Sequence, residues 1–327
     1  MATFSNLFGA ISIISLVLTL QLACFASAQL SPDFYATTCP NLRGIVRVAM
    51  REAIDRELRL GASILRLFFH DCFVNGCDAS ILLDETPTFT GEKNALPNRN
   101  SARGFEVIDT IKTRVEAACS NTVSCADILA IAARDGVVLV TRRTNMGSST
   151  GPERRDNRKP SRRKHPNPLP ILRPPGPHLR LRRQRPTSAH DMTALSGGHT
   201  IGFARCTTFR SRIYNDTNID PNFAARRRTT CPSFAGGSGD DSLAPLDIQT
   251  PNRFGNDYYV DLLNRRGLLH SDQELFNGGS QDGLVRAYSG NQNAFYRDFA
   301  DAMVKMGNIS PLTGINGQIR RNCRVVN

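Results

Sequence analysis

The stretch Gly61–Asp84, GASILRLFFHDCFVNGCDASILLD, begins as an apolar run with helical periodicity and ends as a polar loop. Arg66 and His70 stand four residues apart within the apolar part, so on a helix they share one face, with Phe69 beside them. A guanidinium and an imidazole on an otherwise apolar helix need a partner or a ligand that offsets the loss of their hydration. The run therefore predicts a buried helix that presents a polar site on one face.

The loop that follows is rich in oxygen donors and is constrained by two cysteines. Asp71, Asp78 and Ser80 supply side-chain oxygens at short spacings, and Cys72 and Cys77 can close the loop. Hard oxygen donors on a constrained loop are what calcium prefers. A core helix followed by a disulfide-closed turn would explain any one of these residues. The whole combination is hard to obtain from packing alone, and it indicates a functional site.

Taken together, the pattern Arg-x-x-Phe-His-Asp-Cys-x-x-x-Gly-Cys-Asp-x-Ser, which begins at Arg66, resembles the distal helix and calcium loop of the secretory plant haem peroxidases, often called class III. The resemblance implies an all-α fold in which two helical halves, stapled by disulfides, sandwich haem b. It also implies an enzyme that reduces hydrogen peroxide while it oxidises small phenolic donors by one-electron steps, with a role in the response to oxidative stress.

The resemblance assigns a role to each residue on the distal side of the haem. His70 acts as general base and then general acid, and Arg66 stabilises the charge that develops on the departing oxygen. Phe69 shields the oxidised haem, and Asn98 accepts a hydrogen bond from His70 and keeps it neutral. The implied ligands of a distal calcium are Asp71, Val74, Gly76, Asp78 and Ser80, with Glu92 linked through water.

A second chemical centre is expected after residue 188. Ser188-Ala189-His190-Asp191 predicts a helix start, with serine as the cap and an acid three residues on. The helix leads to Gly197-Gly198-His199, where two glycines remove bulk beside a histidine. One interpretation makes His199 a helix C-terminal residue favoured by the dipole. The resemblance instead makes His199 the axial ligand of the haem iron and Asp272 the partner that raises its basicity.

A proximal calcium site is also implied, with one departure from the family. Its ligands would be Thr200, Asp247, Thr250 and the carbonyl of Arg253. The family has an aspartate where this chain has Gly255. Calcium affinity follows the number of charged ligands, so the sequence predicts a weakened or absent proximal calcium.

Cysteine usage and the amino terminus both indicate secretion. Residues 1–28 read as a signal peptide, with an apolar segment, Ala10 to Phe25, followed by Ala26-Ser27-Ala28 and cleavage before Gln29. A transmembrane anchor is the alternative, but the segment is short for a span. The peroxidase domain is then 29–327, and the extracellular space or cell wall is its expected location. We expect a monomer that binds neither membrane nor nucleic acid, and Asn215-Asp216-Thr217 predicts glycosylation of Asn215.

Of the nine cysteines, Cys24 leaves with the signal peptide, and an even number in a secreted chain favours disulfides. A zinc site is the rival interpretation, but no Cys-x-x-Cys pairs with a second such motif. Sequence alone does not choose among the possible pairings. The resemblance implies Cys39–Cys119, Cys72–Cys77, Cys125–Cys323 and Cys206–Cys231.

The segment 141–188 departs from the family altogether. Residues 141–190 hold fourteen lysines and arginines against two acids, and nine of the eighteen prolines. One interpretation is a polybasic arm for acidic lipid, nucleic acid or cell-wall polyanion, within a cell-wall protein that has lost turnover. A catalytically impaired, secreted calcium-binding protein is a second alternative. We favour a misread reading frame bounded by two compensating shifts, because the family's glycine- and tryptophan-containing element is missing and the chain has no tryptophan.

Overall fold

The computed structural model describes residues 33–142 and 188–327, which are mainly helical. The expected signal peptide lies outside these residues, and so does the Arg/Pro-rich segment apart from Thr141, Arg142 and Ser188. The all-α class is confirmed, because the described residues contain only one small sheet, formed by two short antiparallel strands. None of the described helices is both long and apolar enough to cross a membrane.

The first half of the chain forms a bundle. Its elements are α2 (Leu42–Arg56), α3 (Leu60–Cys72), η1 (Ser80–Leu82), α4 (Phe105–Ala118) and α5 (Cys125–Arg142). Helix α3 lies against α5 at a pair of glycines, where a Cβ on Gly61 would come within 2.8 Å of the Val140 side chain. The small residues let the two helices approach closely, and this contact holds the helix that carries Arg66 and His70.

The second half begins at Ser188. Its elements are α6 (Ala189–Ser196), η4 (Gly197–Thr200), β1 (Phe203–Arg205), α7 (Cys206–Asn215), α8 (Pro221–Arg228), β2 (Leu243–Pro245), α9 (Asp257–Leu263), α10 (His270–Glu274), α11 (Asp282–Gly290), α12 (Gln292–Gly307) and η5 (Gly314–Asn316). The strands β1 and β2 pair with Phe203 opposite Pro245. The predicted helix start is confirmed, because Ser188 and Asp191 form a reciprocal capping box at α6.

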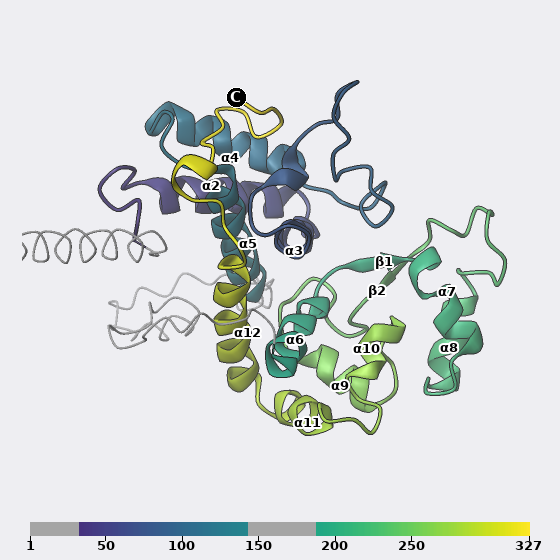
Figure 1. Ribbon diagram of the computed structural model, residues 1–327. Helices are drawn as coiled ribbons and strands as arrows, with labels where there is room; N and C mark the ends of the chain where they lie inside the picture. Colours follow the sequence, from purple (N-terminus) through teal and green to yellow (C-terminus); the bar gives the residue numbers. More distant parts are fainter. Residues whose placement is uncertain (1–32, 143–187) are drawn as a thin grey trace, which may run out of the picture.

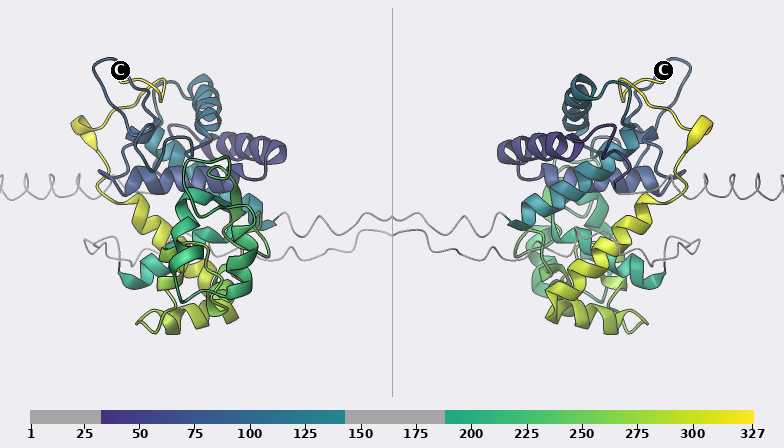
Figure 2. Two further views of the ribbon diagram at one scale, coloured as in Figure 1. Left: turned by 90° about the vertical axis from the view of Figure 1, so that its right-hand side faces the viewer. Right: turned by 90° about the vertical axis from the view of Figure 1, so that its left-hand side faces the viewer.

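The two halves lie one above the other and share a core. In Figure 1 the helices α2–α5 occupy the upper half and α6 and α9–α11 the lower half, and α12 runs from the lower half toward the upper. The two side views in Figure 2 show the same division. Buried side chains from both halves, such as Ile64, Phe254 and Phe299, belong to one hydrophobic core. A smaller core around Cys206 and Phe223 supports α7 and α8.

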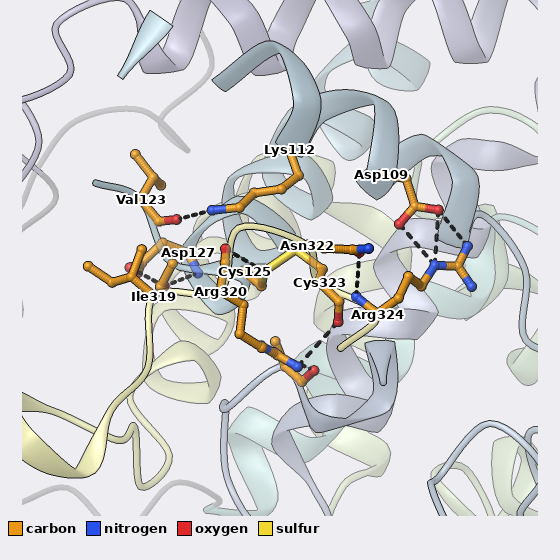
Figure 3. The surroundings of a disulfide bond; sticks show 12 residues. Asp109, Lys112, Val123, Cys125, Asp127, Ile319, Arg320, Asn322, Cys323 and Arg324 are labelled. Atoms are coloured by element: carbon orange, nitrogen blue, oxygen red, sulfur yellow. Dashed lines mark hydrogen bonds and ion pairs between the residues drawn. A yellow bond between two sulfur atoms is a disulfide. The ribbon is translucent and has the colours of Figure 1, made fainter. Parts of the chain in front are cut away.

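Four disulfides join the chain in the pairing that the family resemblance implies. The bonds are Cys39–Cys119, Cys72–Cys77, Cys125–Cys323 and Cys206–Cys231. Figure 3 shows how polar contacts surround the third of them: Lys112 Nζ donates to the Val123 carbonyl at 2.7 Å and Arg320 donates to the Cys323 carbonyl at 3.2 Å. Arg324 Nε also donates to Asp109 Oδ1 on α4 at 2.9 Å, so this contact and the bond from Cys323 to Cys125 fix the carboxy terminus against α4 and α5.

Candidate active site

Helix α3 carries the distal pair as the spacing predicts. Arg66 Nε donates a hydrogen bond of 3.1 Å to His70 Nε2, and its terminal nitrogen donates to the Pro97 carbonyl at 2.7 Å and to Ser101 Oγ at 3.1 Å. These acceptors satisfy a guanidinium whose pKa is lowered by burial. The loop that follows Pro97 therefore holds Arg66 beside His70 on the same helix face.

His70 is set up as a neutral base. Burial, followed by the charge of Arg66, lowers the pKa of His70 from 6.5 to about 4. Because Nε2 accepts the hydrogen bond from Arg66, the ring proton of the neutral form belongs on Nδ1. Phe69 lies edge-on to the His70 ring at 5.6 Å between centroids and keeps 40% of its surface exposed. The geometry thus leaves a basic nitrogen beside a cation and an exposed aromatic ring.

One expected contact of this pair is not formed. The predicted hydrogen bond from His70 to Asn98 is absent among the described residues, where Asn98 Oδ1 is buried without a hydrogen-bond partner. The amide nitrogen of Asn98 instead donates to the Glu92 carbonyl at 2.9 Å. The contact with the Glu92 carbonyl, and not a contact with the His70 imidazole, therefore sets the orientation of the Asn98 amide. This orientation leaves the amide oxygen without a donor.

The predicted distal calcium residues gather around Asp71. Ser80 Oγ donates to Glu92 Oε1 at 2.9 Å, and the Ser80 backbone N–H donates to Asp78 Oδ1 at 2.8 Å. The Ala79 N–H donates to Asp71 Oδ2 at 3.0 Å. Val74 and Gly76 lie on the same disulfide-closed loop, and Gly76 has a positive φ of 113° that a side chain would strain.

The chemistry of this cluster fits a hard cation. Asp71 Oδ1 and Glu92 Oε2 are buried and have no hydrogen-bond partner among the described residues. Burial, together with the nearby charges of Asp78 and Glu92, raises the pKa of Asp71 to about 7, although the Ala79 N–H opposes the shift. Unpaired carboxylate oxygens beside other acids need a positive charge to remain ionised. Calcium ligation by these residues remains a prediction.

The second half contributes a histidine held by a buried carboxylate. His199 Nδ1 and Asp272 Oδ1 lie 2.7 Å apart, and Tyr258 donates a hydrogen bond of 3.1 Å to the same carboxylate oxygen. The other oxygen of Asp272 accepts from the Leu269 N–H at 2.9 Å. Burial lowers the pKa of His199, but the charge of Asp272 and the bond to it outweigh burial and leave the pKa raised. Asp272 is 2% exposed and its orientation is fully determined.

The two histidine centres belong to one region of the molecule. The charge of Arg66 on α3 is one of the smaller influences on His199 and lowers the pKa of its imidazole. A Cβ on Gly198 would lie 3.4 Å from Leu65, the neighbour of Arg66 in α3. The glycine before His199 therefore lets η4 approach the distal helix closely. An imidazole with a carboxylate partner is the type of ligand that haem iron takes.

A further set of oxygen atoms surrounds Asp247, which is fully buried. Its Oδ2 accepts from Thr200 Oγ1 at 3.0 Å and from Thr250 Oγ1 at 3.3 Å, and its Oδ1 accepts from the Thr250 N–H. The Arg253 N–H donates to the Thr250 carbonyl, which closes the turn before Gly255. The structure brings the predicted proximal residues together, and their role as calcium ligands stays a prediction.

Comparison with known proteins identifies the family. A family model described as peroxidase matches residues 46–291. Peroxidase 4 from Vitis vinifera is 53% identical over 320 residues, which cover 94% of this chain and 95% of that protein. Peroxidase 68 from Arabidopsis thaliana is 56% identical over 313 residues, 94% of each chain. Peroxidase P7 from Brassica rapa subsp. rapa is 53% identical over 305 residues, 91% of this chain and 100% of that protein.

The chain belongs to the plant secretory peroxidases, class III. The peroxidase is thus an oxidoreductase that acts on hydrogen peroxide and a reducing substrate, and the resemblance noted in the sequence is confirmed. Within residues 33–142 and 188–327 no group of three or more histidine, cysteine, aspartate or glutamate side chains is placed to hold a metal ion. The calcium ligands expected for the peroxidase also include hydroxyl and backbone carbonyl oxygens. A group defined by histidine, cysteine, aspartate and glutamate side chains leaves these oxygens out, so its absence does not test the expected calcium sites.

Sequence reasoning missed several residues of the site. Pro97 and Ser101 hold Arg66, Tyr258 holds Asp272, and Asp257 accepts a hydrogen bond of 3.0 Å from Thr250. Tyr258 carried one usable signal, because it is a polar aromatic residue on the apolar face of a short helix, where its hydroxyl needs a partner. Pro97 and Ser101 lie in a loop, where no periodicity marks them, and Asp257 is the first residue of α9, a polar position that gives no sign of its partner.

Proposed function

We propose that the peroxidase reduces hydrogen peroxide with small phenolic donors, and that it would hold haem b through His199, with Arg66 and His70 as the residues that act on the peroxide. The observation that carries this proposal is the pair of differently tuned histidines. One is kept neutral beside a guanidinium, and the other is hydrogen-bonded to a buried carboxylate. When bound, haem supplies a redox-active iron with a coordination position for peroxide.

His70 moves the proton in the proposed reaction. Its neutral imidazole takes the proton from the inner oxygen of hydrogen peroxide and returns it to the outer oxygen, which leaves as water. Two phenol molecules then each give one electron and one proton, so that one peroxide and two phenols yield two waters and two phenoxyl radicals. Phe69, which is exposed beside His70, would keep the donors at the haem edge.

Arg66 and Asp272 supply the electrostatics. Arg66 stabilises the negative charge that develops on the departing oxygen, and its bonds to Pro97 and Ser101 hold the guanidinium in place before the reaction. Asp272 accepts the Nδ1 proton of His199, fixes the ring tautomer and makes Nε2 a stronger ligand. Asn98, whose side-chain oxygen is buried and unpaired, is the proposed acceptor of a hydrogen bond from His70 Nδ1.

The distal calcium is part of the proposal. Asp71, Asp78 and Ser80 would bind the ion with side-chain oxygens, Val74 and Gly76 with backbone carbonyls, and Glu92 through water. Support comes from the unpaired oxygens of Asp71 and Glu92 described above. Glu92 also contacts Asn98 through its carbonyl, so the ion would stabilise the loop that supports the distal pair.

We further propose that the peroxidase is secreted as a glycosylated monomer to the extracellular space or cell wall, without membrane or nucleic-acid partners. The signal peptide at 1–28 supports secretion. Asn215 is exposed at the end of α7, which supports its modification. The reading-frame hypothesis for 141–188 stands as a proposal of its own, and sequencing the transcript across this stretch tests it. An intact Arg/Pro frame would refute it.

The experiment that tests the catalytic proposal compares three histidine variants after haem loading. His70→Ala should lower the rate of the peroxide step by about 10²–10⁴-fold while the Soret band remains. His199→Ala should lose the band or shift it. His190→Ala is the matched control, since this histidine is 53% exposed and its contacts are with Asp298 and the Tyr288 ring, away from the proposed reaction. An unchanged rate in His70→Ala defeats the assignment.

A further inference from the structure

Gly255 has no side chain where the family has an aspartate, and the carboxylate of Asp257 lies close to that position. A Cβ placed on Gly255 would meet no atom closer than 3.4 Å. The second nearest atom is Asp257 Oδ2 at 3.7 Å, and the Arg253 carbonyl oxygen follows at 4.0 Å. The carboxylate two residues later along the chain therefore lies within contact distance of the point where a side chain at position 255 would begin, beside the amide nitrogen of Gln292.

Asp257 is also connected to the other proximal oxygens. The Thr250 hydroxyl lies 3.0 Å from Asp257 Oδ2 and 3.3 Å from Asp247 Oδ2, so it stands between the two carboxylates. Thr200 Oγ1 adds a contact of 3.0 Å to the same oxygen of Asp247. The set has two carboxylates and two hydroxyls, all hard donors, with the Arg253 carbonyl beside them. This is the chemistry that calcium selects.

We propose that Asp257 supplies the carboxylate that position 255 lacks, so that this peroxidase retains a proximal calcium site with a relocated ligand. The inference rests on the proposed calcium binding, and it is independent of haem. On binding, the threonine hydroxyls turn their lone pairs toward the ion and give up the hydrogen bonds that they donate to the carboxylates. The sequence predicts a weakened or absent site from Gly255 alone, and with Asp257 as a ligand we expect a site that is weakened and still present.

The side chain of Arg253 sets the strength of this site. Its guanidinium lies 3.2 Å from Asp257 Oδ2 and keeps 42% of its surface exposed, so it can turn to solvent when an ion arrives. While it remains in place it neutralises part of the charge that would bind calcium. We therefore expect an affinity lower than that of a Gly255→Asp variant and higher than that of Asp257→Asn.

The test counts calcium in the purified full-length protein and follows thermal unfolding with and without a chelator. Wild type should hold one distal and one proximal ion. Asp257→Asn should lose one ion, or bind it roughly tenfold more weakly or worse, and should show a smaller chelator-induced shift in melting temperature. Gly255→Asp combined with Asp257→Asn should recover the ion. Asp301→Asn, an exposed acid on α12, is the matched control and should keep both.

The distal variant Asp71→Asn separates the two sites. If wild type holds one ion and Asp71→Asn abolishes it, the relocated proximal site is wrong and the distal proposal stands. If wild type holds no calcium, both fail. If wild type holds two ions and Asp257→Asn also holds two with unchanged affinity, calcium binds without Asp257 and the inference is overturned.

Discussion

The low pKa of His70 predicts a specific pH profile for the peroxide step. The pKa of His70 lies at about 4 because the ring is partly buried and stands beside Arg66. Only the neutral imidazole can accept the peroxide proton, so the rate should stay level as the pH falls toward 5 and should decline with an inflection near 4. Because the pKa of His70 is lowered, the imidazole stays neutral in the folded protein until the pH falls to about 4. His70 loses its ability to act as a base only below that pH.

The size of the effect follows from the shift. With a pKa of about 4, roughly nine-tenths of His70 is neutral at pH 5, whereas an unshifted imidazole at 6.5 would be only about 3% neutral. The expected advantage of the shift at pH 5 is therefore about 30-fold in rate. Burial is the larger cause and the charge of Arg66 the smaller, so removing that charge should recover part of the shift and not the whole.

The assay is stopped-flow measurement of the reaction of peroxide with the haem-loaded protein between pH 3.5 and 8. Arg66→Leu should lower the plateau rate and move the inflection upward, to a value still below 6.5. Arg66→Lys is the control: it loses the fork of hydrogen bonds but keeps a cation, so its plateau should fall while its inflection stays near 4. A wild-type inflection near 6.5, or identical inflections in all three proteins, would refute the reasoning.

Three further predictions concern the supporting structure. Tyr258→Phe removes a hydrogen-bond donor from Asp272, so Asp272 becomes a stronger acceptor and His199 gains negative character. The reduction potential of the iron should then fall, by about 60 mV if the hydroxyl changes the free energy of reduction by about 1.4 kcal/mol. Spectroelectrochemistry measures this potential. Replacing Cys125 and Cys323 by alanine opens a loop of 198 residues and should lower the free energy of unfolding by at most about 5 kcal/mol, measured by denaturant titration. Gly197→Ala would press a methyl group against a buried phenylalanine ring and should cost about 1–3 kcal/mol in the same assay.

Two of these predictions have a matched control. Alanine at Cys72 and Cys77, which close a separation of only 5 residues, should cost about 2 kcal/mol in the loop-entropy view, and an equal loss for both pairs would contradict it. Gly198→Ala meets its nearest neighbour at 3.4 Å and should be milder than Gly197→Ala. An unaltered potential in Tyr258→Phe would mean that this hydroxyl does not tune His199.

The sequence carried enough to predict the distal helix and its site. The four-residue spacing of Arg66 and His70 depends only on helix geometry, and α3 forms as that spacing requires. The capping residues at Ser188 are equally local, and the cap is present. The pairing of His199 with Asp272 joins residues 73 apart in sequence, and only the family resemblance anticipated it.

The remaining details depend on the directions that individual side chains take. The missing bond between Asn98 and His70 and the contact of Tyr258 with Asp272 are tertiary. The approach of Asp257 to Gly255 is local, but it depends on the side-chain direction at the start of α9. No periodicity or spacing encodes which of several nearby acceptors an amide or a hydroxyl will choose. The sequence predicted the elements that present the site, and the structure was needed to say which neighbours complete it.

The disulfide Cys125–Cys323 has a consequence for the integrity of the chain. Cys125 precedes residues 143–187 and Cys323 follows them, whereas each of the other three bonds in the described chain stays on one side of that interval. A protease cut anywhere inside the interval would therefore yield two fragments that still migrate as a single species on a gel until a thiol reductant is added. A nicked preparation would pass as intact by size alone, and only electrophoresis under reducing conditions would reveal the break.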